Sequence, residues 1–485
     1  MPDHDEKLAR VKRRLEAAGQ SHALTFYDRL DNVARRALVD QIDALNLEAL
    51  PGLVEKYVRS KPSFAPAGEI QPAPYYPKDE GSPTRPWDRA AMKRAGEEIV
   101  RAGKVAAFTV AGGQGTRLGY DGPKGQFPGG AVTKKPLFQC LAEWIIAASK
   151  KYGVTIPWYI MTSPLNHEAT RVFLAANNFF GMSEKDVMLF PQGEMPSFDL
   201  RTGKMLLAEP GVVATNPDGH GGSLLALARS GAIADMRRRG VEHISYVQID
   251  NPLARVIDPV FIGLHARAPD SSGEMSSKMV AKSDPAERVG VFARVGGKTC
   301  VVEYSDLPKE MAEARHADHR LKFNAGSIAI HVIGVSFVQR LNEVENAGGG
   351  GFALDFHRAE KKVPYIDLED GRRIEPMQPN AVKLEAFVFD ALALCKSSIV
   401  YETDRVEEFA PIKNAEGADS PATCREIQTV RAARWLGMSG VEVPRDESGK
   451  PVCTLEISPM TAMEPEDLRG VKLPKVIEKG AAVAI

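Results

Sequence analysis

The spacing of hydrophobic positions along this chain changes near residue 97. Before it, apolar side chains recur every three or four residues among charges, as at Leu8, Val11 and Leu15. This spacing predicts amphipathic helices from the start of the chain to about residue 60. A proline-rich stretch follows, with prolines at 62, 66, 72, 74, 77, 83 and 86. Its composition predicts an extended strap over a domain surface.

After residue 97, short apolar runs alternate with helical patterns. Strands are predicted at 105–110, 158–161, 187–190 and 244–249, and helices at 136–151, 166–177 and 222–239. Asn166 is expected to cap the second of these helices. The alternation predicts a mainly parallel sheet covered by helices on both faces. Ligands bind such sheets at the carboxyl ends of the strands, where a glycine-rich loop and Asp250 both fall.

The later part of the chain has more strand than helix character. Runs at 289–295, 299–304 and 327–331 favour antiparallel pairing, and runs at 400–402 and 451–457 predict a small β-containing C-terminal domain. At 485 residues the chain is longer than one core usually serves. We therefore expect a Rossmann-like α/β fold with a mixed, mainly parallel sheet. The predicted division is a helical segment and strap (1–96), a central α/β domain with the glycine-rich loop (97–395) and a C-terminal domain (396–485).

Composition narrows the classes of partner. The chain has 62 basic and 63 acidic side chains, a net charge of −1, so no global field attracts nucleic acid or an anionic membrane. No stretch has the length and apolarity of a membrane span, and the first thirty residues are too charged for a signal peptide. The five cysteines are scattered and form no C-x-x-C pair, which indicates reduced thiols in a cytoplasmic protein. Any anion site must therefore be local.

A glycine-rich loop follows the first predicted strand. It reads AGGQGTRLG over Ala111–Gly119, and GPKG follows at Gly122–Gly125. Its glycines let backbone amides approach phosphate oxygens, while Arg117 and Lys124 supply positive charge. The dinucleotide fingerprint would need glycine where Leu118 stands, and the chain's Gly-Lys-Thr run lacks the upstream glycine of a Walker loop. The loop therefore predicts a nucleoside triphosphate site of another class.

The pattern G-G-x-G-x-R followed by P-K resembles the signature of sugar-nucleotide pyrophosphorylases. Further segments resemble motifs of the eukaryotic-type UDP-N-acetylhexosamine pyrophosphorylases, in that family's order and along nearly the whole chain. They are Asn216–Gly222, Asp250–Asn251, Gly290, Val302–Ser305, Phe323–Gly326, Glu385–Asp390 and Pro411–Asn414. Gln114 in the first loop favours the N-acetylhexosamine enzymes over the UDP-glucose enzymes.

The resemblance implies a uridylyltransferase. UTP and N-acetylglucosamine 1-phosphate would give UDP-N-acetylglucosamine and pyrophosphate by in-line attack on the α-phosphate, assisted by Mg²⁺ or Mn²⁺. Such a reaction needs positioning and charge neutralisation more than acid–base chemistry. A UDP-glucose or broad UDP-sugar pyrophosphorylase is an open alternative. A catalytically silent UDP-sugar binding protein is another, although it would not need to retain every phosphate-binding group.

The resemblance also assigns roles to residues of this chain. Arg117, Lys124 and Lys413 would act on the phosphates, and Gly290, Glu303 and Asn324 would bind the sugar. The nucleotide would contact Ala111, Gly112, Gly113, Gly115, Thr116, Gln192, Gly219 and His220, with Gln192 and Gly219 at the uracil. Asp250 would hold the metal, with Asp390 as a weaker second ligand. His220 and Ser327 stand where the family pattern has asparagine, which leaves the preferred sugar open.

Overall fold

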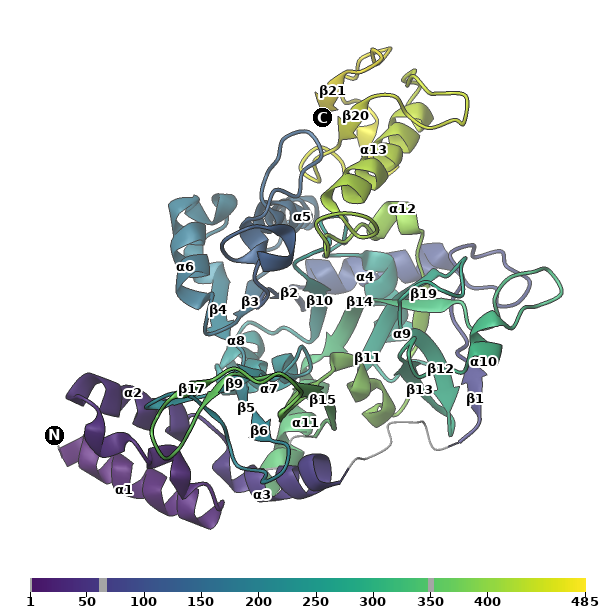
Figure 1. Ribbon diagram of the computed structural model, residues 1–485. Helices are drawn as coiled ribbons and strands as arrows, with labels where there is room; N and C mark the ends of the chain where they lie inside the picture. Colours follow the sequence, from purple (N-terminus) through teal and green to yellow (C-terminus); the bar gives the residue numbers. More distant parts are fainter. Residues whose placement is uncertain (1, 61–67, 348–352) are drawn as a thin grey trace. The chain divides into compact units, whose positions relative to one another are not determined.

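The computed structural model describes residues 2–60, 68–347 and 353–485 (Figure 1). The chain forms two compact units, each built from three separate segments. The smaller unit contains Met1–Ala65, Gln192–Ala226 and Gln339–Asp390, and the larger contains Pro66–Pro191, Leu227–Val338 and Ala391–Ile485. The predicted division at residues 96 and 395 stays a prediction. Pro62 and Pro66 of the predicted strap lie outside the described residues.

The N-terminal part of the smaller unit is helical, as predicted. Its helices and helical turns are α1 (Pro2–Ala17), η1 (Ser21–Leu24), η2 (Tyr27–Arg29), α2 (Asn32–Asp43), η3 (Leu47–Ala49), α3 (Leu50–Leu53) and η4 (Val54–Arg59). Val11 and Leu15 of α1 and Leu38 and Ile42 of α2 are buried. The apolar positions that predicted amphipathic helices therefore form a core between them.

Short antiparallel sheets complete the smaller unit. Their strands are β5 (Glu194–Pro196), β6 (Phe198–Asp199), β7 (Leu207–Glu209), β8 (Val212–Val213), β9 (Thr215–Pro217), β15 (Phe356–Lys361), β16 (Tyr365–Ile366), β17 (Arg373–Ile374) and β18 (Ala381–Ala386). The pairings are β15–β18–β6, β5–β9, β7–β8 and β16–β17. The β5–β9 pair carries the segments with predicted uracil contacts.

A ten-stranded mixed sheet forms the centre of the larger unit, in the order β1-β12-β14-β10-β2-β3-β4 with β11, β13 and β19 attached. Its strands are β1 (Ile70–Pro72), β2 (Val105–Val110), β3 (Trp158–Thr162), β4 (Val187–Pro191), β10 (His243–Gln248), β11 (Met275–Ala281), β12 (Val291–Val295), β13 (Lys298–Val302), β14 (Ala325–Gly334) and β19 (Val400–Glu402). Strands β10, β2, β3 and β4 are parallel, whereas β14 is antiparallel to β10 and β11. The predicted mixed α/β architecture is confirmed.

The remaining elements of the larger unit are helices and one small strand pair. They are α4 (Arg89–Arg101), η5 (Thr116–Leu118), η6 (Lys124–Gln126), α5 (Leu137–Tyr152), α6 (His167–Ala176), η7 (Asn178–Gly181), η8 (Glu184–Asp186), α8 (Ala232–Arg238), α9 (Pro259–Arg267), α10 (Lys309–Glu313), α12 (Arg405–Glu408), α13 (Pro421–Met438), β20 (Thr454–Glu456), η10 (Pro465–Leu468) and β21 (Ala482–Ala484). Three further helices continue from one unit into the other: α7 (Gly222–Arg229), α11 (Val335–Ala347) and η9 (Val388–Leu394).

Side chains of the parallel strands alternate between two buried faces. Trp158 and Ile160 of β3 join the core that contains residues of α5 and α9, whereas Tyr159 between them donates a hydrogen bond to Asp235 of α8. Because successive strand residues point to opposite faces, helices cover both sides of this sheet. The predicted strands are continuously apolar because both faces of the sheet are buried under helices.

Three local predictions differ from the structure. The helix expected over 222–239 is two helices, because Gly231 between α7 and α8 has a left-handed φ of +83°. The run at 400–402 does not belong to a C-terminal sheet: as β19 it pairs in parallel with β11 in the central sheet. The strap contributes β1, which pairs with β12, and thus becomes an edge of that sheet. Propensity could not foresee these long-range pairings.

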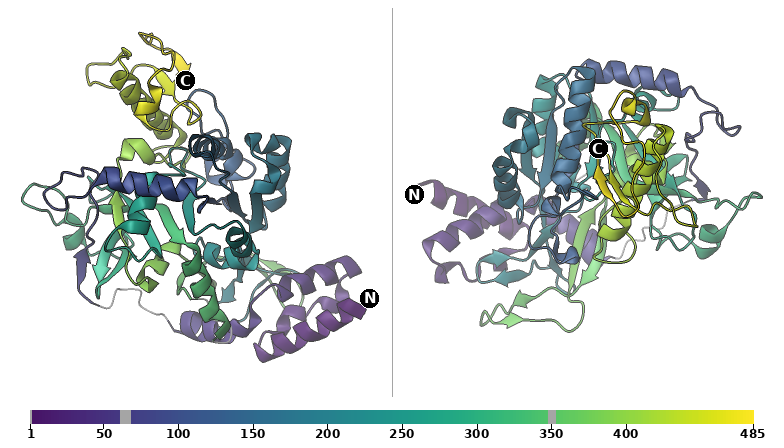
Figure 2. Two further views of the ribbon diagram at one scale, coloured as in Figure 1. Left: turned by 180° about the vertical axis from the view of Figure 1, so that it is seen from behind. Right: turned by 90° about the horizontal axis from the view of Figure 1, so that it is seen from above.

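The C-terminal residues of the larger unit have a core of their own. Trp435 and Leu436 of α13 pack with Leu455 of β20 and with Ile477. Figure 2 shows this end of the chain, in yellow, as a helix with short strands. The predicted β-containing C-terminal part is therefore present, as the parallel pair β20–β21 beside α13. Among the helices of the described ranges, none combines the length and apolar character that a membrane crossing requires.

Candidate active site

The glycine loop begins where β2 ends and is closed by its own backbone. The amide of Lys124 donates to Gly113 O at 3.0 Å, and the amide of Gly115 donates to Gly122 O at 2.9 Å. These two bonds join the limbs of the loop. The amides of Gly112 and Gly113 make no hydrogen bond within the described residues, so both are available to a phosphate.

Three predicted contacts in this loop stay predictions, and the structure shows which donors they could not use. The Gly115 amide is used by Gly122 O, so this glycine shapes the loop and does not donate to phosphate. Its role is steric, because a Cβ there would lie 2.8 Å from the side chain of Tyr120. Ala111 is fully buried and its amide donates to Met161 O at 2.7 Å, which leaves it no free donor. Thr116 is exposed at the surface of the loop.

Asn166 supports the loop, a role that the sequence did not reveal. It occupies the N-cap position of α6 as predicted, but its side chain caps no helical amide. Its Nδ2 donates instead to Ala111 O at 3.1 Å and Gly113 O at 3.2 Å, and its Oδ1 accepts from the Ser163 amide. A single buried amide therefore fixes the two carbonyls that flank Gly112. The partners are more than fifty residues apart, so no local pattern could report the contact.

The predicted phosphate-binding cations lie together at this edge of the sheet. Lys124 Nζ is 3.8 Å from Asp250 Oδ2. Burial lowers the pKa of Lys124, and the positive charges of Lys413 and Arg117 lower it further, against the opposing effect of Asp250. Mutual repulsion of this kind requires the three cations to be near neighbours. Asp250 pairs with Lys124, and Asp419 Oδ2 lies 3.9 Å from Lys413 Nζ, so two carboxylates oppose three cations. The remaining positive charge favours an anionic ligand.

Lys413 is held next to Asp250 by hydrogen bonds of the backbone and of one side chain. The Ile412 amide donates to Asp250 O at 2.8 Å. Asn251 Nδ2 donates to Glu408 O at 2.7 Å, while its Oδ1 accepts from the Ala410 amide at 3.1 Å. We call this arrangement the Asn251 clamp. It joins the end of β10 to residues 408–412, and Lys413 follows immediately.

A small cavity of about 50 Å³ lies between these groups, lined by Asp250, Ser327, Ala329 and Lys413 among others. Ala329 has a φ of +54°, in the left-handed region that non-glycine residues rarely adopt. The register between β11 and β14 shifts at the same point, which identifies a β-bulge. Bulges of this kind are over-represented beside active sites. Ser327, at the position where the family pattern has asparagine, lines the same cavity as Asp250, the predicted metal ligand.

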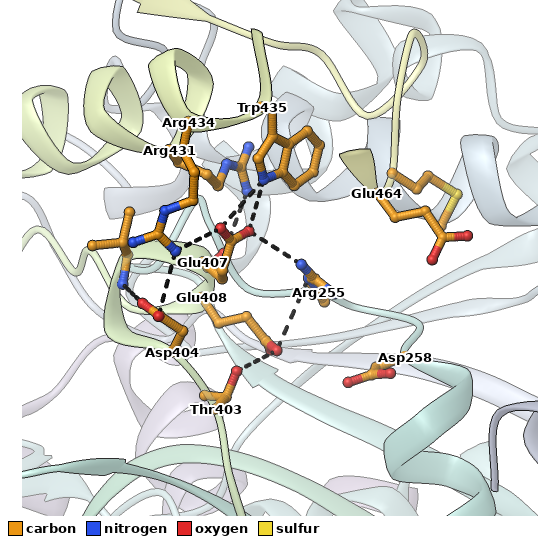
Figure 3. Close-up of polar contacts among 12 residues, drawn as sticks. Arg255, Asp258, Thr403, Asp404, Glu407, Glu408, Arg431, Arg434, Trp435 and Glu464 are labelled. Atoms are coloured by element: carbon orange, nitrogen blue, oxygen red, sulfur yellow. Dashed lines mark hydrogen bonds and ion pairs between the residues drawn. The ribbon is translucent and has the colours of Figure 1, made fainter. Parts of the chain in front are cut away.

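A buried network of charges anchors the segment that carries Lys413, and Figure 3 shows its members Arg255, Asp258 and Glu408. Lys278 of β11 is fully buried and contacts Asp258 and Glu408 at 2.6 and 2.5 Å. Burial alone would raise the pKa of Asp258, but Lys278 and Arg255 hold it at about 2. The Asp258 carboxylate is therefore ionised, and Lys278 pairs with both carboxylates. Removing one partner from such a group is strongly destabilising.

The same network reaches α13, which carries Arg434 and Trp435. Glu407 accepts hydrogen bonds from Arg255 at 3.2 Å, from Arg434 at 3.1 Å and from the Trp435 indole at 3.0 Å (Figure 3). Residues 404–408 are thus fixed on one side to the central sheet and on the other to α13. Because residues 404–408 are held in place, the chain that leads from them to Lys413 begins at a fixed point.

Strand register brings the three predicted sugar-binding residues together. Val291 pairs with Val302 and with Gly326, so Gly290 lies opposite Glu303 and beside the start of β14, which Asn324 precedes. A Cβ at Gly290 would be 3.2 Å from Glu303 Oε1, and Gly290 O accepts from the Ser327 amide at 2.8 Å. Asn324 is buried, and its side chain makes no hydrogen bond within the described residues. The group offers a carboxylate and an amide to a polar ligand.

The predicted uracil contacts lie together within the smaller unit. Glu194 pairs with Pro217 in the two-stranded antiparallel sheet β5–β9, so Gln192 and Gly219 lie opposite each other just beyond its end. Gln192 is buried and makes no hydrogen bond within the described residues, which argues against a solvated surface turn. Gly219 has a φ of +86°, and a Cβ there would lie 2.4 Å from Ala386 O. Only glycine fits at this position.

His220 is neutral and its tautomer is fixed by its surroundings. Its ring stacks on Phe387 with centroids 5.2 Å apart, and its Nδ1 accepts from the Val388 amide at 3.1 Å. The proton therefore resides on Nε2, which makes that nitrogen a donor. Burial, followed by the neighbouring His357, lowers the pKa of His220 to about 4. A group with this pKa is uncharged at neutral pH and is not a general acid there.

The candidate metal site has one buried carboxylate. Asp250 is buried, and within the described residues its carboxylate pairs only with Lys124. Mg²⁺ is commonly held by one or two carboxylates together with substrate phosphates, so this donor fits it. Asp390, the weaker candidate, belongs to the smaller unit and accepts from His357 Nε2 at 2.8 Å. Within the described residues, no three His, Cys, Asp or Glu side chains form a metal-binding group.

Comparison with known proteins agrees with these motifs. Residues 80–419 match the family described as UTP–glucose-1-phosphate uridylyltransferase. UDP-N-acetylhexosamine pyrophosphorylase-like protein 1 of Homo sapiens is 36% identical over 94% of this chain and 93% of its own. UDP-N-acetylglucosamine pyrophosphorylase of Saccharomyces cerevisiae is 38% identical over 72% of this chain and 73% of its own.

A solved structure extends the match to the fold. The crystal structure of the uridine diphosphate N-acetylglucosamine pyrophosphorylase from Trypanosoma brucei in complex with inhibitor has a TM-score of 0.79 at 25% identity, covering 100% of this chain and 98% of its own. The resemblance inferred from the motifs is confirmed. The chain belongs to the UTP–glucose-1-phosphate uridylyltransferase family, together with the UDP-N-acetylhexosamine and UDP-N-acetylglucosamine pyrophosphorylases.

Proposed function

We propose that this chain is a UTP:N-acetylglucosamine-1-phosphate uridylyltransferase that forms UDP-N-acetylglucosamine and pyrophosphate. The observation that carries the proposal is Lys124, which pairs with Asp250 and is repelled by Lys413 and Arg117, beside a glycine loop in which the amides of Gly112 and Gly113 make no hydrogen bond within the described residues. The names of the relatives at 36–38% identity support N-acetylglucosamine over glucose as the sugar.

The reaction needs little from the protein beyond position and charge. An oxygen of the sugar phosphate attacks the α-phosphorus of UTP in line, a P–O bond forms, and the bond to pyrophosphate breaks. In the proposed roles, the amides of Gly112 and Gly113 and the side chains of Arg117, Lys124 and Lys413 offset the charge that the phosphates carry. Such preorganised groups stabilise charge without reorganisation during the step.

The cofactor in this proposal is Mg²⁺, or Mn²⁺ in its place. Asp250 would hold the ion, which would supply further charge neutralisation at the phosphates. The residues of this chain orient the reactants: Gln192 and Gly219 would bind uracil, and Glu303 and Asn324 would bind the sugar hydroxyls and acyl group. His220 would donate from Nε2 and would not transfer a proton, because its pKa of about 4 leaves it neutral.

A cytoplasmic location is part of the proposal. Its support is the state of the cysteines: Cys140, Cys395 and Cys424 are buried as free thiols, and no disulfide joins the cysteines of the described residues.

The reverse reaction tests the enzyme class. The purified protein is mixed with UDP-N-acetylglucosamine, pyrophosphate and Mg²⁺, and UTP is measured by chromatography. Pyrophosphate-dependent UTP formation is expected. A protein that binds the UDP-sugar but forms no UTP would be a silent binding protein, and the proposal would be wrong.

A further inference from the structure

Lys282 is a buried cation that forms no ion pair with the described residues. It follows β11 directly, and only 6% of its surface is exposed. Its Nζ makes one weak contact, to Pro285 O at 3.5 Å, and no carboxylate of the described residues forms an ion pair with it. Burial lowers the pKa of this lysine, with Glu287 and Asp284 opposing. A buried ammonium group without an ion pair destabilises the folded protein, and a bound anion would remove that cost.

The nearby carboxylates already have partners. Glu287 Oε1 accepts from Arg405 at 2.5 Å, and Asp284 Oδ1 accepts from the Ala286 amide at 2.8 Å. Neither lies within ion-pair distance of Lys282. Within the described part of the chain, no carboxylate therefore pairs directly with Lys282, and the direct anionic partner that we infer for it is a ligand.

The position of Lys282 selects the ligand. Its amide donates to Asn324 O at 2.8 Å, and its Cγ would lie 3.3 Å from a Cβ on Gly326. Gly326 in turn pairs with Val291, the neighbour of Gly290. The lysine stem thus lies over the strand start that carries the sugar-binding group.

The order of strands separates this lysine from the triphosphate loop. Across the edge of the sheet the strands run β2, β10, β14, β11, so the glycine loop, Asp250, Asn324 and Lys282 follow in that order. With about 4.8 Å between neighbouring strands, Lys282 is about 5 Å from the strand of Asn324 and about 14 Å from that of the loop. The predicted sugar-binding group is therefore the nearer of the two subsites to Lys282, and the glycine loop is the farther one.

We propose that Lys282 binds the phosphate of the sugar 1-phosphate, as a substrate contact additional to Glu303 and Asn324. This inference rests on the proposed function. It predicts that the charge of Lys282 determines the use of the sugar phosphate and has little influence on the use of UTP. It also predicts that the lysine is retained for binding and at the expense of stability, since an unpaired buried charge destabilises the free protein.

Steady-state kinetics on three variants test the proposal. Lys282→Met keeps the length of the stem and removes the charge, and should raise KM for N-acetylglucosamine 1-phosphate about tenfold to a hundredfold, the effect of one charged hydrogen bond. KM for UTP should change by about twofold or less. Lys282→Gln should resemble Lys282→Met, whereas Lys282→Arg should recover much of the loss. Lys298→Met is the matched control, because Lys298 also donates to a carbonyl, Cys395 O, at the other end of β13 from Glu303.

Thermal unfolding without substrate gives a second readout. Lys282→Met should be as stable as the parent or more stable. An unchanged KM for the sugar phosphate, equal rises in both KM values, or a Lys282→Gln variant at the parent level would each overturn the proposal. A less stable Lys282→Met would point to a structural lysine and also overturn it.

The proposed function and the role of Lys282 can fail separately. If the parent protein does not join UTP to any sugar 1-phosphate, the proposed function is wrong. Stabilisation of the parent against heat by N-acetylglucosamine 1-phosphate, lost in Lys282→Met, would still support the contact. A parent that is active and a Lys282→Met variant with unchanged kinetics would overturn only the contact.

Discussion

Replacing Asn251 by alanine should reduce both stability and turnover. The substitution removes the clamp and leaves Glu408 O and the Ala410 amide without their side-chain partner, in a segment where both residues are buried. A buried polar group that loses its partner costs about 1–3 kcal/mol, so the expected loss is about 2–6 kcal/mol. Urea unfolding followed by circular dichroism measures this quantity.

The effect on turnover follows from the position of Lys413. The clamp fixes residues 408–412 at the end of β10, and a shift of about 1 Å in a catalytic group costs about a hundredfold in rate. We therefore expect kcat of Asn251→Ala to fall about tenfold to a hundredfold at a temperature where the variant is folded. Asn380→Ala is the matched control, since Asn380 bridges the carbonyl and amide of Val363 at 3.0 and 2.8 Å in the smaller unit. It should lose stability but keep kcat.

A double-mutant cycle separates positioning from general loosening. If Asn251 acts through Lys413, the combined loss in Asn251→Ala/Lys413→Ala should be smaller than the product of the two single losses. Independent, multiplying effects would refute the reasoning. So would an Asn251→Ala variant that is destabilised by several kcal/mol and still turns over at the parent rate.

Four other substitutions test the remaining site residues. Lys124→Ala should leave the fold intact and lower kcat/KM about a hundredfold, as measured by steady-state kinetics with a melting curve as control. Asp250→Asn should raise the Mg²⁺ concentration needed for half-maximal rate, and an unchanged metal dependence would move the metal elsewhere. Glu303→Ala should impair use of the sugar phosphate more than use of UTP, and equal damage to both would make it structural. His220→Asn should keep activity and change the preference among sugar 1-phosphates by about tenfold or less; near-complete loss with every sugar would contradict a mechanism without proton transfer. Because the pKa of His220 falls from 6.5 to about 4 in the folded state, its contribution to stability is present above pH 6.5 and is lost as the pH falls toward 4. Over that range the parent should therefore lose up to about 3 kcal/mol more than His220→Asn in urea unfolding.

Much of the site could be predicted because it is local in sequence. The buried runs at 105–110 and 244–249 are strands within one residue of their predicted bounds, and the loop and Asp250 follow them directly. The sugar-binding group depends only on antiparallel register between three successive strands. Alternating and continuous apolar runs carry this information well.

The missed features depend on contacts between distant residues. Asn166 supports the glycine loop from more than fifty residues away, Asn251 and Glu408 are 157 apart, and β19 joins β11 across more than a hundred residues. At Gly115, residue type suggested an amide that binds phosphate. In the structure this amide donates to Gly122 O, and the lack of a side chain leaves room for Tyr120. Nothing in the sequence singles out Lys282, because what distinguishes it is the lack of an ion pair with the described residues, which only the structure reveals.

One measurement tests the central claim most directly. The purified protein is assayed with UTP, Mg²⁺ and each of four 1-phosphates, those of N-acetylglucosamine, N-acetylgalactosamine, glucose and galactose, and pyrophosphate release is recorded. The account predicts turnover that depends on both substrates, with the highest kcat/KM for N-acetylglucosamine 1-phosphate. A preference for glucose 1-phosphate would contradict the proposed substrate, and no pyrophosphate with any of the four would contradict the proposed reaction.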